Sequence, residues 1–203
     1  MSRFEIVNIE QGSDLWLKFR QSKITASQVP ILFSESPYQN LYDLLAEKII
    51  GTKPETNTYK LALYEKGFAA ERAGRLYAKE HYGIDLNPAV VVSLMHKHLM
   101  ASLDGFSDDR KTIFEAKYMG KEKLSLVKTG IIPKHHDIQI QAQLLVSGAE
   151  KCIYFATDPE GESAIAEISP DIALFEEIAI KAAKFMDVVG FIKSGSKQKR
   201  VRS

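Results

Sequence analysis

Two short apolar stretches with the composition of β-strands lie in the middle of the chain. They cover Leu99 to Phe106 and Thr112 to Lys117, and the polar turn Ser107-Asp108-Asp109-Arg110 separates them. A turn this short favours two strands that pair as a hairpin. A sheet built around this hairpin therefore constrains where every other element can lie.

The rest of the chain predicts helices on both sides of this hairpin and a few further strands. The fold class we expect is α/β, with a central mixed sheet flanked by helices. The chain lacks regular β-α-β alternation, a GxGxxG motif and a Walker A motif, which argues against a nucleotide-cofactor fold. Helices are expected at 13–20, from a turn at 24–27, and at 36–50, 59–82, 121–129, 133–147 and 170–189; further strands are expected at 4–9, 86–93, 151–157 and 164–168, and a loop at 52–58.

Composition bounds the domain organisation and the compartment. With 203 residues, 45% of them apolar, the chain suits one domain with a real core, which we place at 1–192; the basic stretch 193–203 is expected to be disordered. The net charge of +1 neither supports nor excludes a local basic groove. A single cysteine, Cys152, rules out an internal disulfide and a four-cysteine cluster. No signal core or bilayer-length apolar run is present, so we expect a cytoplasmic protein with no membrane contact.

The hairpin carries two acidic residues and a lysine that can converge on one point. Asp104 lies near the end of the first strand, and Glu115 and Lys117 lie two apart on the second, so their side chains share a face. Two carboxylates, with the Ala116 carbonyl, are the oxygen ligands that Mg²⁺ prefers, and the ion would activate water against a phosphate. Lys117 would orient and stabilise the charged phosphate. The same spacing also fits a surface hairpin with a cross-strand ion pair worth under about 1 kcal/mol.

Helical segments offer further polar residues, each with a plain structural alternative. Glu71 follows Tyr64 and Phe68 on one side of its helix, where an acid is either a metal ligand or a boundary residue. Gln141 faces the core, where its amide either bridges backbone groups or positions water, whereas Gln139 and Gln143 are expected to be solvated. Arg20 and Ser27 flank a helix start that suits a phosphate, and equally a surface arginine and an N-cap. His96, His98, His135 and His136 lack the further ligands that a zinc site needs.

Several short motifs follow one another in a fixed order between about residues 4 and 189. They are Gln11-Gly12-Ser13, Trp16, Arg20, Ile24 to Ser27, Leu44 to Glu47, Gly67, Glu71, Ser102 to Gly105, Glu115 to Lys117, Gln139 to Gln141 and Tyr154 to Ala156. Taken together, these pieces resemble the family of lambda exonuclease and the YqaJ-type viral recombinases, and their order is what makes the likeness specific. At the position where the family often has proline before the motif aspartate, this chain has Leu103.

The resemblance implies a restriction-endonuclease-like, PD-(D/E)XK core and 5′-to-3′ digestion of duplex DNA ends that leaves a 3′ single strand for recombination. It implies two Mg²⁺ ions, with Mn²⁺ able to substitute, held by Asp104 and Glu115, with Lys117 in the active site. It further assigns Glu71 to the metal site and Gln141 to the nucleophilic water. Arg20, Ser27 and Ser102 would bind the 5′-terminal phosphate. It also implies a homotrimeric ring, a single-strand annealing partner and a phage or prophage gene in a bacterial host.

Two other functions remain open at this stage. An endonuclease of the same fold would share Asp104, Glu115 and Lys117 without needing a pocket for a DNA end. A non-enzymatic protein that binds DNA ends as a recombination scaffold would use the carboxylates only structurally. Cutting of closed circular DNA would indicate the first, and activity unaffected by Asp104→Ala would indicate the second.

Overall fold

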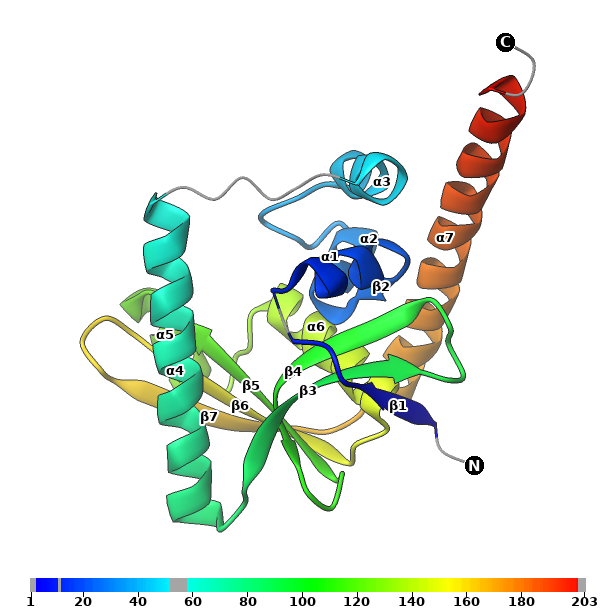
Figure 1. Ribbon diagram of the computed structural model, residues 1–203. Coiled ribbons are helices and arrows are strands. Elements are labelled where there is room, and N and C mark those ends of the chain that lie inside the picture. Colours follow the sequence, from blue (N-terminus) through cyan, green and yellow to red (C-terminus); the bar gives the residue numbers. More distant parts are fainter. Residues whose placement is uncertain (1–2, 11, 52–57, 201–203) are drawn as a thin grey trace.

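The fold comes from a computed structural model that describes residues 3–10, 12–51 and 58–200, without the side chains of 58–60 and 196–200. Its strands form one mixed sheet in the order β1-β3-β4-β5-β6-β7, with the two-residue β2 paired to β4 (Figure 1). The β2–β4 and β5–β6 pairs are parallel, and the remaining pairs are antiparallel. The predicted mixed sheet is therefore confirmed. The strands are β1 (Phe4–Val7), β2 (Ile24–Thr25), β3 (Leu86–Ser93), β4 (Leu99–Ser107), β5 (Thr112–Tyr118), β6 (Lys151–Thr157) and β7 (Ser163–Ile168).

The two central strands of the hairpin pair only close to their turn. Gly105 lies opposite Phe114 and Phe106 opposite Ile113, and there the ladder between β4 and β5 ends. Beyond that point β5 continues along β6, while the first residues of β4 pair with β2 instead. The two strands therefore separate into a fork immediately before the position where Asp104 would pair with Glu115.

Helices cover both faces of the sheet. On one face, α4 packs against a cluster that includes Leu86, Phe114 and Phe155. On the other face, α6 packs across β3, β4 and β5, with α2 and α7 behind it. The main core, around Leu103, Ile113 and Tyr154, lies on this second face. The helices are α1 (Asp14–Gln21), the 3-10 turn η1 (Ala26–Gln28), α2 (Val29–Leu32), α3 (Leu41–Ile50), α4 (Thr58–Tyr82), α5 (Lys121–Lys128), α6 (Lys134–Ser147) and α7 (Ile172–Arg200).

The structure departs from the sequence-based expectations at two helix ends. Helix α3 begins at Leu41, not at 36, because Asn40 accepts hydrogen bonds from the first-turn amides in a capping box. Helix α7 continues to Arg200, past the expected end at 189, and so includes most of the tail for which disorder is expected; the lysines, glutamine and arginine there are good helix formers. Residues 52–57 of the expected loop at 52–58 lie outside the described residues, and so does Gln11. None of the described helices has the length and apolar character needed to cross a bilayer.

Candidate active site

Glu115 is the centre of a hydrogen-bond network at the fork. Its side chain is only 2% exposed and points to the α6 face of the sheet. Gln139 donates to its Oε1 at 2.6 Å, and Gln143 donates to its Oε2 at 2.6 Å. The Lys117 ammonium lies 2.5 Å from Oε1 and also reaches Gln139 Oε1 at 3.3 Å. A buried carboxylate needs such partners, and here two amides and one ammonium supply them.

Asp104 closes the fork from the other strand. Its Oδ2 accepts a hydrogen bond from the Ala116 backbone N–H at 2.9 Å, so this side chain bridges β4 and β5 where their backbones no longer pair. Ala116 lies between Glu115 and Lys117 in the sequence. The structure therefore brings Asp104, Glu115 and Lys117 together as the hairpin spacing predicted.

The electrostatics of the fork are those of two acids held close together with one cation. Loss of hydration raises the pKa of Asp104 well above its ordinary value, and the charge of Glu115 raises it further. Burial by itself lowers the pKa of Lys117, but the attraction of Glu115 and Asp104 outweighs it, so the pKa rises on balance. Lys117 is therefore a charged group at neutral pH, suited to stabilising a phosphate and unsuited to taking a proton from water.

Glu71 reaches the same site from α4, with Arg75 one helical turn later. Arg75 donates to the Asp104 backbone carbonyl at 2.7 Å and lies 3.5 Å from Glu71 Oε2. Burial raises the pKa of Glu71, Arg75 lowers it, and Glu115 adds a smaller increase. Glu71 is thus a third acid close enough to feel the fork, and Arg75, which the sequence did not single out, fixes the helix to β4.

The structure corrects the assignment of the glutamines. Gln141 does not reach the fork: its amide donates to the Ser169 carbonyl at 3.0 Å and accepts from the Asp171 N–H at 2.8 Å. Gln139 and Gln143, which were expected to be solvated, are the two residues that hold Glu115. They are four apart and share one face of α6, whereas Gln141 lies on the opposite side. The i, i+4 pair of glutamines was the signal that could have identified them.

Of the residues proposed to bind the DNA end, Arg20 and Ser102 both contact Trp16. The Arg20 guanidinium lies 4.6 Å from the centre of the Trp16 ring, and Trp16 Nε1 donates to Ser102 Oγ at 3.1 Å. Arg20 Nε is buried and, within the described part of the chain, has no hydrogen-bond partner. Trp16 therefore contacts both Arg20 and Ser102, and the buried Nε of Arg20 is a donor without a partner in the described part of the chain.

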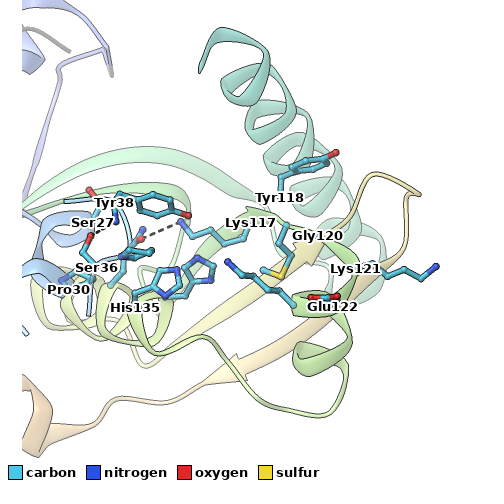
Figure 2. A pocket seen from close by; sticks show the side chains of 15 residues that line it. Ser27, Pro30, Ser36, Tyr38, Lys117, Tyr118, Gly120, Lys121, Glu122 and His135 are labelled. Carbon is cyan, nitrogen blue, oxygen red and sulfur yellow. Dashed lines mark hydrogen bonds between the residues drawn. The ribbon is translucent and has the colours of Figure 1, made fainter. Parts of the chain in front are cut away.

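Ser27 lies elsewhere, at a cavity of about 610 Å³ beside the fork. Lys117 and Gln139 line this cavity together with Tyr38 and His135, and Figure 2 shows Lys117 pointing into it while Lys121 points away. The Ser27 hydroxyl is 3.0 Å from Thr25 Oγ1. No direct contact joins Ser27 to Arg20 among the described residues, so the structure unites only part of the expected phosphate pocket.

Comparison with known proteins identifies the family. The profile of the YqaJ-like viral recombinase domain matches residues 15–150, which is more than half of the chain. The chain belongs to this family. The matched segment contains the fork, the glutamines of α6 and the Arg20 region.

Solved structures show that the YqaJ-like domain has the fold expected of it. An alkaline exonuclease from Laribacter hongkongensis, also solved in complex with dAMP, superposes with TM-scores of 0.75 and 0.76 at 20% identity, over 94% of this chain and 99% of that one. A phage-related exonuclease from Haemophilus somnus 129PT superposes with a TM-score of 0.57 at 12% identity, over 82% and 94% of the two chains. The restriction-endonuclease-like, PD-(D/E)XK fold is thereby confirmed.

A curated relative is a much longer protein. The uncharacterized protein R354 of Acanthamoeba polyphaga mimivirus is 22% identical over 162 residues, which is 73% of this chain and 29% of that protein. This chain thus spans less than a third of that relative's length, and the relative's name assigns no activity to either of them.

The donor set of the YqaJ-like domain suits a hard divalent cation. No group of three or more His, Cys, Asp or Glu side chains arranged for a metal occurs among the described residues, so a site that needs four protein ligands is not formed there. Mg²⁺ needs fewer: one or two carboxylates with water and substrate phosphate complete its octahedron. Asp104 and Glu115 meet this need. Burial, and after it the charge of Glu115, raises the pKa of Asp104, and a bound cation would favour the charged carboxylate against both effects. The fork therefore fits the expected ion.

Proposed function

We propose that this protein is a Mg²⁺-dependent exonuclease that digests one strand of duplex DNA from its 5′ end and leaves a 3′ single strand. The observation that carries the proposal is the convergence of Asp104, Glu115 and Lys117 where β4 and β5 separate. Membership of the YqaJ-like viral recombinase family and the shared fold with two exonucleases support it. Tyr64 and Phe68 precede Glu71 on α4 and are exposed, so an apolar surface that a nucleic acid could contact lies on this helix.

In this mechanism the side chains position a phosphodiester and the water that attacks it. Asp104, Glu115 and the Ala116 carbonyl would hold the metal, which supplies a water of lowered pKa and neutralises charge on the phosphate. Lys117 donates to a phosphate oxygen and stabilises the charge that develops there. Gln139 and Gln143 fix the Glu115 carboxylate so that its oxygens keep one orientation.

The proposal includes a grip on the DNA end and an assembly around the DNA. Arg20 and Ser102 would bind the 5′-terminal phosphate, with Ser27 approaching it from the neighbouring cavity. A homotrimeric ring and a single-strand annealing partner are proposed from the family resemblance, as is action in the cytoplasm of a bacterial host. Two bound ions, with Mn²⁺ able to replace Mg²⁺, are proposed on the same ground.

The first test is digestion of linear duplex DNA that carries either a 5′-phosphate or a 5′-hydroxyl. Release of acid-soluble nucleotides with Mg²⁺ is expected from both, faster from the phosphorylated end, and a chelator is expected to stop it. The Arg20 guanidinium is the physical reason for the preference. Closed circular duplex is the control, and its cleavage at a comparable rate would indicate an endonuclease instead.

A second prediction separates the glutamines of α6. Gln143→Ala should lower the rate of nucleotide release by about tenfold or more, because the Glu115 carboxylate is then held by one amide in place of two. Gln141→Ala should instead lower the free energy of unfolding by about 1–3 kcal/mol, since two backbone groups lose their partner, with a smaller effect on the rate of the folded protein. Rates and thermal melting of both variants provide the measurement. Equal rates for the two variants would contradict the assignment.

A further inference from the structure

Lys48, on α3, is the one lysine whose side chain is fully buried in the described part of the chain, with 0% exposure. A lysine in a protein interior is rare, because its ammonium loses hydration that only well-placed partners can replace. Nothing in the fork requires this charge, since Lys48 belongs to a different element and contacts none of the residues there. Its position therefore calls for a separate explanation.

The ammonium of Lys48 contacts the region where the DNA end is proposed to bind. It donates to the Arg20 backbone carbonyl at 2.9 Å and to Gln28 Oε1 at 2.8 Å. Its third neighbour is Glu47 Oε1 at 3.5 Å. Lys48 thus holds the last turn of α1, which carries the Arg20 side chain, against η1 and α3.

The contacts of Gln28 extend this network to Ser27. Gln28 donates to Glu47 Oε1 at 2.8 Å and accepts from the Thr25 N–H at 3.3 Å. Thr25 in turn contacts the Ser27 hydroxyl at 3.0 Å. Arg20 and Ser27 do not touch each other. The group of Lys48, Gln28 and Glu47 nevertheless contacts the backbone of Arg20 directly and reaches Ser27 through Thr25.

The charges of this group favour an anion. Arg20 and Lys48 carry two positive charges, Glu47 carries one negative charge, and Lys193 approaches Lys48 from α7. Among the described residues, Glu47 is the only carboxylate that acts on these cations, and the Tyr64 hydroxyl is the only other acidic group near Arg20. A positive charge held out of water acts over a longer range than one at the surface, because less solvent screens it.

We propose that Lys48 is a positioning residue for the 5′-terminal phosphate: it holds the Arg20 turn in place and adds a buried positive charge behind it. This inference rests on the proposed function, because it presupposes that the phosphate of the DNA end binds at Arg20. Lys48 does not touch the DNA. Its contribution lies in the affinity for phosphorylated ends and leaves the chemical step at the fork unaltered.

Protonation gives the inference a second observable. Burial lowers the pKa of Lys48 to about 8, with Glu47 opposing that shift and Arg20 adding to it. The ammonium is therefore present below about pH 8 and is lost above it, while a terminal phosphate stays doubly charged throughout that range. The preference for phosphorylated ends should accordingly weaken as the pH rises through this value.

The test compares KM and kcat of Lys48→Met on duplexes with 5′-phosphate and 5′-hydroxyl ends. Methionine preserves length and removes the charge and the hydrogen bonds. We expect KM for phosphorylated ends to rise about tenfold, KM for hydroxyl ends to stay within about twofold, and kcat to change little, since binding alone is affected. Lys18→Met removes an exposed charge from the same helix as Arg20 and should leave both KM values unchanged.

Two further measurements make the outcome decisive. In the unsubstituted protein, KM for hydroxyl ends divided by KM for phosphorylated ends should fall from about pH 7 to about pH 9.5. In Lys48→Met this ratio should not change with pH. If Lys48→Met does not fold, a flat ratio in the unsubstituted protein overturns the inference. Arg20→Ala distinguishes a failure of the proposed role of Lys48 from a failure of the proposed phosphate site. Loss of the preference in Arg20→Ala but not in Lys48→Met refutes the role of Lys48 alone, and no preference in any protein refutes the phosphate site itself.

Discussion

Asp104→Asn is expected to lower the rate of nucleotide release by about 100- to 1000-fold while leaving the fold intact. Asparagine keeps an oxygen that can accept the hydrogen bond from the Ala116 N–H, so the junction between β4 and β5 is preserved. What it removes is the negative charge that a metal at the fork requires. Single-turnover digestion of linear duplex DNA with Mg²⁺ measures the loss.

The same substitution is expected to raise the melting temperature slightly in the presence of a chelator. The pKa of Asp104 is higher in the folded protein than in the unfolded chain, chiefly because of burial and then because of Glu115. A carboxyl of this kind opposes folding as the pH rises above its unfolded value of about 4, so a neutral side chain removes the cost. Loss of activity together with equal or greater stability would identify a functional charge in place of a structural one.

Asp85→Asn is the matched control for this pair of effects. Asp85 is 61% exposed and pairs with Lys79 at the surface. It contributes nothing to the proposed metal site. A surface ion pair of this kind contributes about 1 kcal/mol or less, so rate and melting temperature should both stay close to those of the unsubstituted protein. Retention of full activity by Asp104→Asn would refute the proposed metal site.

The hairpin was predictable from sequence because its determinants are local. Strand composition on both sides of a short polar turn fixes which segments pair, and the register then places Asp104 near Glu115. The fork itself was not predictable. It arises because β5 follows β6 and the start of β4 pairs with β2, and these partners are distant in sequence.

The glutamines show where periodicity alone is insufficient. Gln141 was correctly placed on the core side of α6, but the helix has buried residues on nearly all sides, so an apolar stripe does not identify the side that faces the fork. Gln139 and Gln143 face the polar gap between β4 and β5 and therefore sit among charged groups although they are largely buried. Only the path of the strands decides which buried glutamine meets a carboxylate.

The second large effect concerns how closely α4 approaches the sheet. A Cβ added at Gly74 would meet the ring of Phe114 closer than real carbon atoms approach, and the Phe155 ring at 2.8 Å. We expect Gly74→Ala to lower the free energy of unfolding by about 1–3 kcal/mol, because the helix must move away from two packed rings. This cost exceeds the gain of up to about 1 kcal/mol that alanine brings to a helix. Thermal and denaturant unfolding provide the measurement.

The displacement should also reduce activity, because Glu71 and Arg75 lie on either side of Gly74 and Arg75 bonds to the Asp104 carbonyl. Gly67 supplies the control, because nothing lies within 4 Å of a Cβ at this position. Gly67→Ala should therefore keep its activity and gain up to about 1 kcal/mol of stability. If the two alanine variants unfold at the same denaturant concentration, α4 does not rest on Phe114 and Phe155 in the way described. If Gly74→Ala loses stability but keeps full activity, the position of α4 is not what aligns the acids at the fork.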